Sequence, residues 1–140
     1  MREFNSIDEA IEAIKNGEMV VVLDDEDREN EGDLLMASQK VTPKAINFML
    51  KYGRGLVCVP MEESKINKLN LKPMTSNNSD PKGTAFTVSV DYKTVDTGIS
   101  AHERALTIKK LVEDESKEMD FTKPGHIFPL RAKDGGVLRR

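Results

Sequence analysis

The fold is first indicated by residues 18–37, Glu18-Met-Val-Val-Val-Leu-Asp-Asp-Glu-Asp-Arg-Glu-Asn-Glu-Gly-Asp-Leu-Leu-Met-Ala37, in which two short apolar runs flank an acidic stretch. The first run lies within residues 18–23 and is rich in β-branched valine, which is typical of a buried strand. The second run, residues 34–37, follows the acidic stretch directly. We therefore expect a buried strand before the acidic stretch and a second short apolar element after it.

Helix signals lie on both sides of this segment. Ser6 and Glu9 have the spacing of a capping box, and the apolar spacing behind them predicts a helix over residues 7–14. Further along, Thr42 and Pro43 form a good N-cap and first-turn pair. A second helix is therefore expected to begin there.

The remaining chain mixes strand and helix patterns. It predicts a strand over 55–60, a short helix over 62–69, a long surface loop over 71–83 and, from alternating apolar and polar residues, a half-buried strand over 86–91. Ser100 and Glu103 form another capping box, and the residues expected to face inward behind it are Ala105, Ile108, Leu111 and Val112. Because strands and helices are intermixed, the predicted fold class is α+β, a mixed sheet with helices packed around it.

Length and composition exclude several classes of protein. The 140 residues predict a single domain over 1–140, and 21 Lys and Arg against 24 Asp and Glu provide no basic field for nucleic acid. No apolar run approaches the roughly 20 residues of a membrane-spanning helix. The N-terminus lacks the apolar core of a signal peptide, and one cysteine excludes a disulfide framework. We expect a cytoplasmic protein that binds neither nucleic acid nor membrane.

The acidic stretch from Asp24 to Asp33 carries seven carboxylates in ten residues. Such crowding is repulsive unless a cation or basic groups offset it. Oxygen ligands without cysteine favour a hard divalent ion, Mg²⁺ or Mn²⁺. Arg28 within the stretch suits a substrate that carries phosphate or an enediol. The alternative interpretation is a solvated acidic turn.

The order of the motifs favours the first interpretation. Arg28-Glu-Asn-Glu-Gly-Asp33 after a strand resembles the signature loop of 3,4-dihydroxy-2-butanone 4-phosphate synthase. The family's further motifs resemble, in order, Gly55-Leu-Val-Cys-Val-Pro60, Phe86-Thr-Val-Ser-Val-Asp91, Thr97-Gly-Ile-Ser-Ala101 and Pro124-Gly-His-Ile-Phe-Pro-Leu-Arg131. The resemblance covers nearly the whole chain.

The resemblance implies conversion of D-ribulose 5-phosphate to L-3,4-dihydroxy-2-butanone 4-phosphate and formate, with Mg²⁺ or Mn²⁺ as cofactor. It implies Glu29 as metal ligand within the substrate site, and Arg28 and Asp33 as substrate contacts. Asp33 or Glu31 is expected to take part in proton transfer, and the residues do not divide these roles. The implied roles of the remaining candidates are acid/base catalysis for His126 and substrate binding for Thr97 and Arg140.

Some of these residues keep a second interpretation. Thr97 precedes a glycine and a capped helix, so it either contacts substrate or forms an ordinary turn leading into the helix. His126 lies among glycine and prolines, which indicates a fixed, irregular backbone, and imidazole titrates near working pH. His102 lacks such surroundings and is expected on a helix surface.

The resemblance also implies a homodimer, and a family domain that extends beyond Arg140 with a histidine ligand and a catalytic glutamate. We therefore expect the chain to lack the C-terminal part of that domain. The alternatives to the lyase are a non-catalytic or truncated fragment of it, or another metal-dependent sugar-phosphate enzyme.

Overall fold

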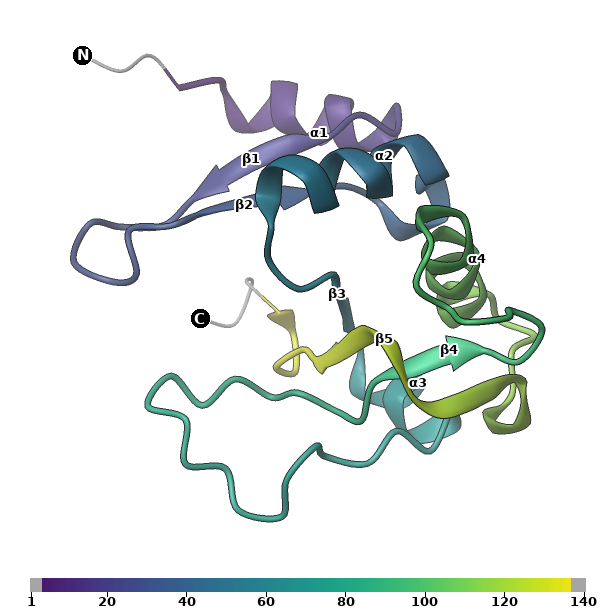
Figure 1. The fold of residues 1–140 in the computed structure, drawn as a ribbon. Helices are drawn as coiled ribbons and strands as arrows, with labels where there is room; N and C mark the ends of the chain where they lie inside the picture. The colour runs from purple at the N-terminus through teal and green to yellow at the C-terminus, as the bar shows by residue number, and fades with distance from the viewer. Residues whose placement is uncertain (1–3, 137–140) are drawn as a thin grey trace.

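The computed structural model describes residues 4–136, which form a two-stranded hairpin and a three-stranded mixed sheet with helices around them (Figure 1). The elements are α1 (Ile7–Lys15), β1 (Val20–Leu23), β2 (Gly32–Leu35), η1 (Ser38–Lys40), α2 (Pro43–Phe48), η2 (Met49–Gly53), β3 (Cys58–Met61), α3 (Glu63–Lys68), β4 (Val90–Tyr92), α4 (Ala101–Val112), η3 (Glu118–Asp120) and β5 (Phe121–Arg131). In the larger sheet β5 is central, parallel to β3 and antiparallel to β4. The predicted α+β class is confirmed.

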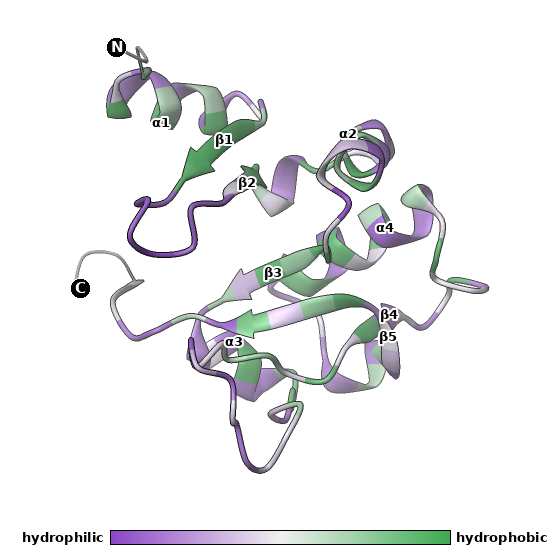
Figure 2. Cartoon of the chain, turned by 60° about the vertical axis from the view of Figure 1, so that its left-hand side comes forward, coloured by the Kyte–Doolittle hydropathy of each residue, from purple (hydrophilic) through white to green (hydrophobic). Residues whose placement is uncertain are grey.

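The N-terminal hairpin forms, but it is not buried. β1 pairs with β2 in antiparallel register from Val20 opposite Leu35 to Leu23 opposite Gly32. The prediction of a buried strand over 18–23 is wrong in its burial, since Val21 is 63% exposed. The physical reason is that β1 pairs only with β2 within the described residues, and α1 beside it buries none of its side chains. In Figure 2 the ribbon of β1 has the green of hydrophobic residues.

The core lies between the three-stranded sheet and the helices α2, α3 and α4. The inward face predicted for α4 is confirmed, because Ala105, Ile108 and Leu111 are buried. α4 is also joined to the sheet by a hydrogen bond, which the backbone N–H of Tyr92 donates to the Thr107 hydroxyl. In the described part of the chain, no helix has the length and apolar character needed to cross a membrane.

The segment before β4 departs from the alternation in the sequence. Regular strand covers only Val90–Tyr92, although a half-buried strand is predicted over 86–91. Three of the buried side chains are polar, Thr87 at 1%, Ser89 at 9% and Asp91 at 6% exposure, and they are buried alongside the apolar Val90 at 0%. Each of the three polar side chains is hydrogen-bonded to the β5 segment, which removes the cost of burying it.

The predicted helix starts are confirmed and allow a matched test. Both capping boxes form, at Ser6 with Glu9 and at Ser100 with Glu103. We expect Ser100→Ala to lower the free energy of unfolding by about 1 kcal/mol, because α4 is part of the core.

The same change at Ser6 serves as the control. Because α1 buries no residue, Ser6→Ala should fray α1 locally and leave the urea midpoint unchanged. Urea unfolding followed by circular dichroism measures the midpoint, and amide exchange measures the fraying. Equal losses of stability in the two variants would contradict this division.

Candidate functional site

Asp24, the residue directly after β1, organises the acidic loop between β1 and β2. Its Oδ1 accepts a hydrogen bond from the backbone N–H of Glu31 at 2.8 Å. Its Oδ2 accepts from the backbone N–H of Glu29 at 3.1 Å and from Nη1 of Arg28 at 2.8 Å. These bonds, first that from Glu31, hold the pKa of Asp24 below its ordinary value. The carboxylate of Asp24 therefore holds the loop together up to Glu31, seven residues further along the chain.

The guanidinium of Arg28 lies between two carboxylates. Its Nη2 is 3.3 Å from Oε1 of Glu29, in addition to the bond from Nη1 to Asp24. Asn30, with a φ of 51°, adopts the left-handed conformation that asparagine tolerates, and the chain reverses there. The structure thus brings together two of the predicted site residues, Arg28 and Glu29, on an exposed loop (Figure 1).

The other two carboxylates predicted for the site lie at the start of β2 and just before it. The side chain of Glu31 is exposed, and its backbone binds Asp24. Asp33 lies opposite Val22 in the hairpin, and its negative charge acts on the thiol of Cys58 in β3. Burial, and then the charge of Asp33, raise the pKa of the Cys58 thiol, so this thiol stays protonated at neutral pH.

His126 lies on a bulge of β5 that the β4 segment holds from one side. Asp91 is paired with Thr122 and Val90 with Ile127, so residues 123–126 form extra chain on β5. The backbone N–H of His126 donates to Oδ1 of Asp91 at 2.9 Å, and the ring Nδ1 lies 2.7 Å from Oδ2. The His126 side chain is 40% exposed, whereas that of Asp91 is 9% exposed. The irregular backbone predicted around His126 is confirmed.

Two glycines permit this close packing. A Cβ at Gly125 would overlap the backbone of Val90, and a Cβ at Gly98 would overlap the carboxylate of Asp91. The backbone N–H of Gly125 also donates to the Ser89 hydroxyl at 3.1 Å. The chain at Gly98 therefore covers the Asp91 carboxylate on one side, while β5 covers it on the other.

The remaining sequence candidates lie elsewhere. The hydroxyl of Thr97, which is exposed, is 3.5 Å from the carboxylate of Glu103 in the turn that begins α4. The hydrogen bonds that Glu103 accepts, first from the Ser100 hydroxyl, lower its pKa to about 2. His102 is exposed on α4, as predicted. Arg140 lies outside the described residues.

The surroundings of Glu29 bear on its predicted role as a metal ligand. Glu29 offers carboxylate oxygens, which Mg²⁺ prefers, but one of them faces the guanidinium of Arg28. Within residues 4–136, no three histidine, cysteine or acidic side chains are clustered so that they could hold an ion. These residues therefore do not form a complete metal centre by themselves.

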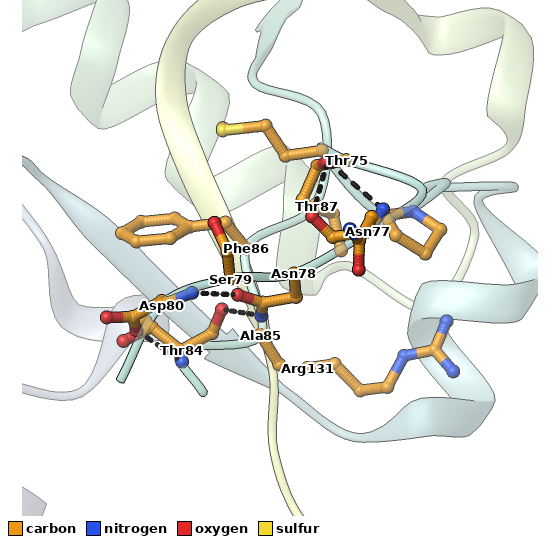
Figure 3. A pocket seen from close by; sticks show the side chains of 12 residues that line it. Thr75, Asn77, Asn78, Ser79, Asp80, Thr84, Ala85, Phe86, Thr87 and Arg131 are labelled. Carbon is orange, nitrogen blue, oxygen red and sulfur yellow. Dashed lines mark hydrogen bonds between the residues drawn. The ribbon is translucent and has the colours of Figure 1, made fainter. Parts of the chain in front are cut away.

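A separate hollow of about 670 Å³ lies beside the long loop that follows α3. Figure 3 shows the turn from Asp80 to Thr84 on one side of it and Arg131 on the other. The Asp80 carboxylate accepts from the backbone N–H of Thr84 at 2.7 Å, and Arg131 pairs with Glu63 at 2.8 Å. Of the predicted site residues that lie within 4–136, none lines this hollow.

Sequence reasoning missed the residues that hold the site in place. Asp24 had a usable signal, since an aspartate directly after a strand commonly accepts hydrogen bonds from the following turn. For Ser89 and Asp91 the only sequence signal was the alternation of residues 86–91, which predicts that the apolar side chains are buried and the polar ones exposed. No hydrogen bond or ion pair joins the acidic loop to His126 among the described residues.

The low pKa of Asp24 gives a testable pH dependence. Because the folded-state pKa lies below the unfolded value of 3.8, the bonds to the amides of Glu29 and Glu31 are present above that value and are lost as the pH falls through the folded pKa. We expect these two amide resonances to shift together in an acid titration followed by NMR, with a midpoint below 3.8. A midpoint at or above 3.8 would contradict the proposed organisation of the loop.

Comparison with known proteins identifies the family of the chain. The family model of 3,4-dihydroxy-2-butanone 4-phosphate synthase matches residues 8–140. The riboflavin biosynthesis protein RibBA of Aquifex aeolicus is 57% identical over 99% of this chain and 35% of its own length, and that of Bacillus cytotoxicus is 56% identical over 98% and 34%.

Solved structures show the same fold. A 3,4-dihydroxy-2-butanone 4-phosphate synthase crystallised with two magnesium ions superposes with a TM-score of 0.94 at 47% identity, over 98% of this chain and 64% of that one. The Candida albicans enzyme gives 0.86 at 50% identity, over 98% of this chain and 67% of that one. The chain thus spans about a third of the curated relatives that it matches. By sequence and by fold, it belongs to the 3,4-dihydroxy-2-butanone 4-phosphate synthase family.

Proposed function

We propose that the chain acts as a lyase that converts D-ribulose 5-phosphate to L-3,4-dihydroxy-2-butanone 4-phosphate and formate, with Mg²⁺ or Mn²⁺ as cofactor. The observation that carries the proposal is the half-exposed imidazole of His126, held by a buried carboxylate, in a chain that also bears the Arg28–Glu29 loop of this family. The two products together contain every atom of the substrate. The reaction therefore needs proton transfers and no redox cofactor.

The chemistry requires a base beside a carbonyl and groups that stabilise the enediolate. His126 is suited to accept and return protons, because an imidazole ring has one nitrogen that can accept a proton and one that can donate it, and the ring here reaches solvent. Asp33 and Glu31 are carboxylates that can take part in proton transfer at the start of the hairpin's second strand. We assign these three residues to proton transfer.

The substrate's oxygens need cationic and hydrogen-bonding partners. Arg28 supplies a guanidinium whose position is set by Asp24 and Glu29, and planar guanidinium groups bind phosphate and paired oxygens well. We propose that Arg28, Glu29 and Asp33 contact the substrate. Thr97 and Arg140 complete the set of substrate contacts that we propose.

Glu29 is the residue that we propose as metal ligand. A divalent ion, when bound, would polarise the adjacent oxygens of the sugar. A family member crystallised with two magnesium ions supports the choice of metal. The described residues offer no complete ligand set, so we assign Glu29 as one ligand of the ion and not as the whole site.

Formate release tests the proposed function directly. The chain is incubated with ribulose 5-phosphate and Mg²⁺, formate is measured with formate dehydrogenase, and the phosphate ester is followed by ³¹P NMR. We expect formate and one new ester in equal amounts, and EDTA should stop both. His126→Gln should lower kcat by about 10²–10⁴-fold, as expected for loss of a general base.

Matched variants separate the site from general effects. His102→Gln removes the exposed histidine of α4 and should leave the rate unchanged. Glu29→Gln should abolish turnover, whereas Glu26→Gln in the same loop should not. A different phosphate ester would favour another sugar-phosphate enzyme. If ribulose 5-phosphate is neither converted nor able to shift the amide resonances of Glu29 and His126, the proposal is wrong.

We further propose that the chain forms a homodimer. The support is a set of exposed apolar side chains on α1 and the β1–β2 hairpin. These side chains are 41–76% exposed and include Ile7, Ile11, Val21, Val22, Leu23 and Leu35. Exposed apolar patches of this kind commonly mark protein interfaces.

Sedimentation velocity at micromolar concentration tests this proposal. We expect a dimer that Val21→Glu converts to monomer, because the charge would have to be buried in the interface. Met119→Glu places the same charge on η3, at a side chain that is also exposed, and should leave the dimer intact. A monomer in the unsubstituted chain would contradict the proposal.

A further inference from the structure

We propose that Asp91 is a positioning residue that holds His126 as the tautomer with its proton on Nδ1, which leaves Nε2 as the proton acceptor. The tautomer follows from the geometry alone, and only its use in catalysis rests on the function proposed above. Asp91 is a residue to which the sequence assigned no role.

Both oxygens of Asp91 bind the same residue. Oδ1 accepts the backbone N–H of His126 at 2.9 Å, and Oδ2 lies 2.7 Å from Nδ1 of the ring. The first contact fixes the backbone of the bulge and the second fixes the rotation of the ring. The imidazole therefore cannot turn over without losing a hydrogen bond to a buried carboxylate.

The chemistry of the pair decides where the proton lies. An ionised carboxylate only accepts hydrogen bonds, so the ring nitrogen that faces it must carry hydrogen. In the neutral imidazole the other nitrogen, Nε2, then has a free lone pair. His126 is 40% exposed, which leaves part of the ring open to a bound molecule.

The surroundings of Asp91 keep its carboxylate in this position. Gly98 lies so close that any side chain there would overlap the carboxylate. On the opposite side, Ser89 binds the backbone of Gly125 and thereby holds the bulge against β4. Asp91 is thus enclosed between the turn before α4 and the bulge of β5.

The nitrogen resonances of the histidine rings test the proposal in the unsubstituted chain. A long-range ¹H–¹⁵N spectrum, recorded well above the ordinary histidine pKa of about 6.5, distinguishes protonated from unprotonated ring nitrogens. We expect Nδ1 of His126 to be protonated and Nε2 to be unprotonated. His102→Gln removes the only other set of histidine signals and so assigns them. The reverse pattern for His126 would overturn the proposal, whatever the activity of the chain.

Asp91→Asn tests the cause. The asparagine oxygen can still accept the backbone N–H of His126, so its amide group then faces Nδ1 and donates to it, and the proton should move to Nε2. We expect the nitrogen spectrum to show Nδ1 unprotonated and Nε2 protonated. We also expect kcat to fall by about 10²–10⁴-fold, with KM little changed. An unaltered tautomer in a folded Asp91→Asn chain would overturn the proposal.

A second pair of variants tests the Asp91 carboxylate by changing the glycine that packs against it. Gly98→Ala should displace Asp91 and populate the other tautomer, whereas Gly83→Ala is the control, since it also has a positive φ but no neighbour within 4 Å. Equal spectra of the two variants would contradict the role of Asp91. The expected tautomer in a chain that neither converts ribulose 5-phosphate nor shows amide shifts with it would refute the proposed function alone. Formate release with the reverse tautomer would refute this inference alone.

Discussion

A row of buried polar side chains, Thr87, Ser89 and Asp91, joins the segment leading into β4 to the central strand β5. Each of them binds a different part of β5: the carbonyl of Pro129, the backbone N–H of Gly125 and the backbone and ring of His126. A buried polar group without a partner costs about 1–3 kcal/mol, so these bonds determine how the two segments can pack. Among the described residues, no buried side-chain nitrogen or oxygen lacks a partner.

This constraint explains the shape of β5. In a regular antiparallel pair the partners of Val90 and Asp91 would be adjacent on β5, but the pairing shifts between these two residues and leaves residues 123–126 of β5 outside the ladder. Ser89 and Asp91 accept hydrogen bonds from the backbone N–H groups of Gly125 and His126, two of the residues outside the ladder. Bulges re-aim side chains, and here the bulge carries the one histidine that reaches both solvent and a buried carboxylate.

The acidic loop follows a different principle. Its order comes from Asp24, whose carboxylate binds backbone and side-chain groups within the next seven residues. The loop and the sheet come near each other where Asp33 acts on Cys58, which is paired with Phe128 of β5. A rigid sheet therefore carries the imidazole, while a locally ordered loop carries the guanidinium and the carboxylates.

Features that depend on neighbours in sequence could be predicted from the sequence by itself. The capping boxes at Ser6 and Ser100, the buried face of α4 and the acidic loop with Arg28 and Glu29 rest on contacts within a few residues or on a continuous motif. Tertiary structure alone decided that β1 is exposed, that the polar side chains of residues 86–91 are buried along with Val90, and that Asp91 holds His126. The physical reason is that each of these depends on what packs against the strand, and Asp91 and His126 are 35 residues apart, a separation that no local pattern encodes.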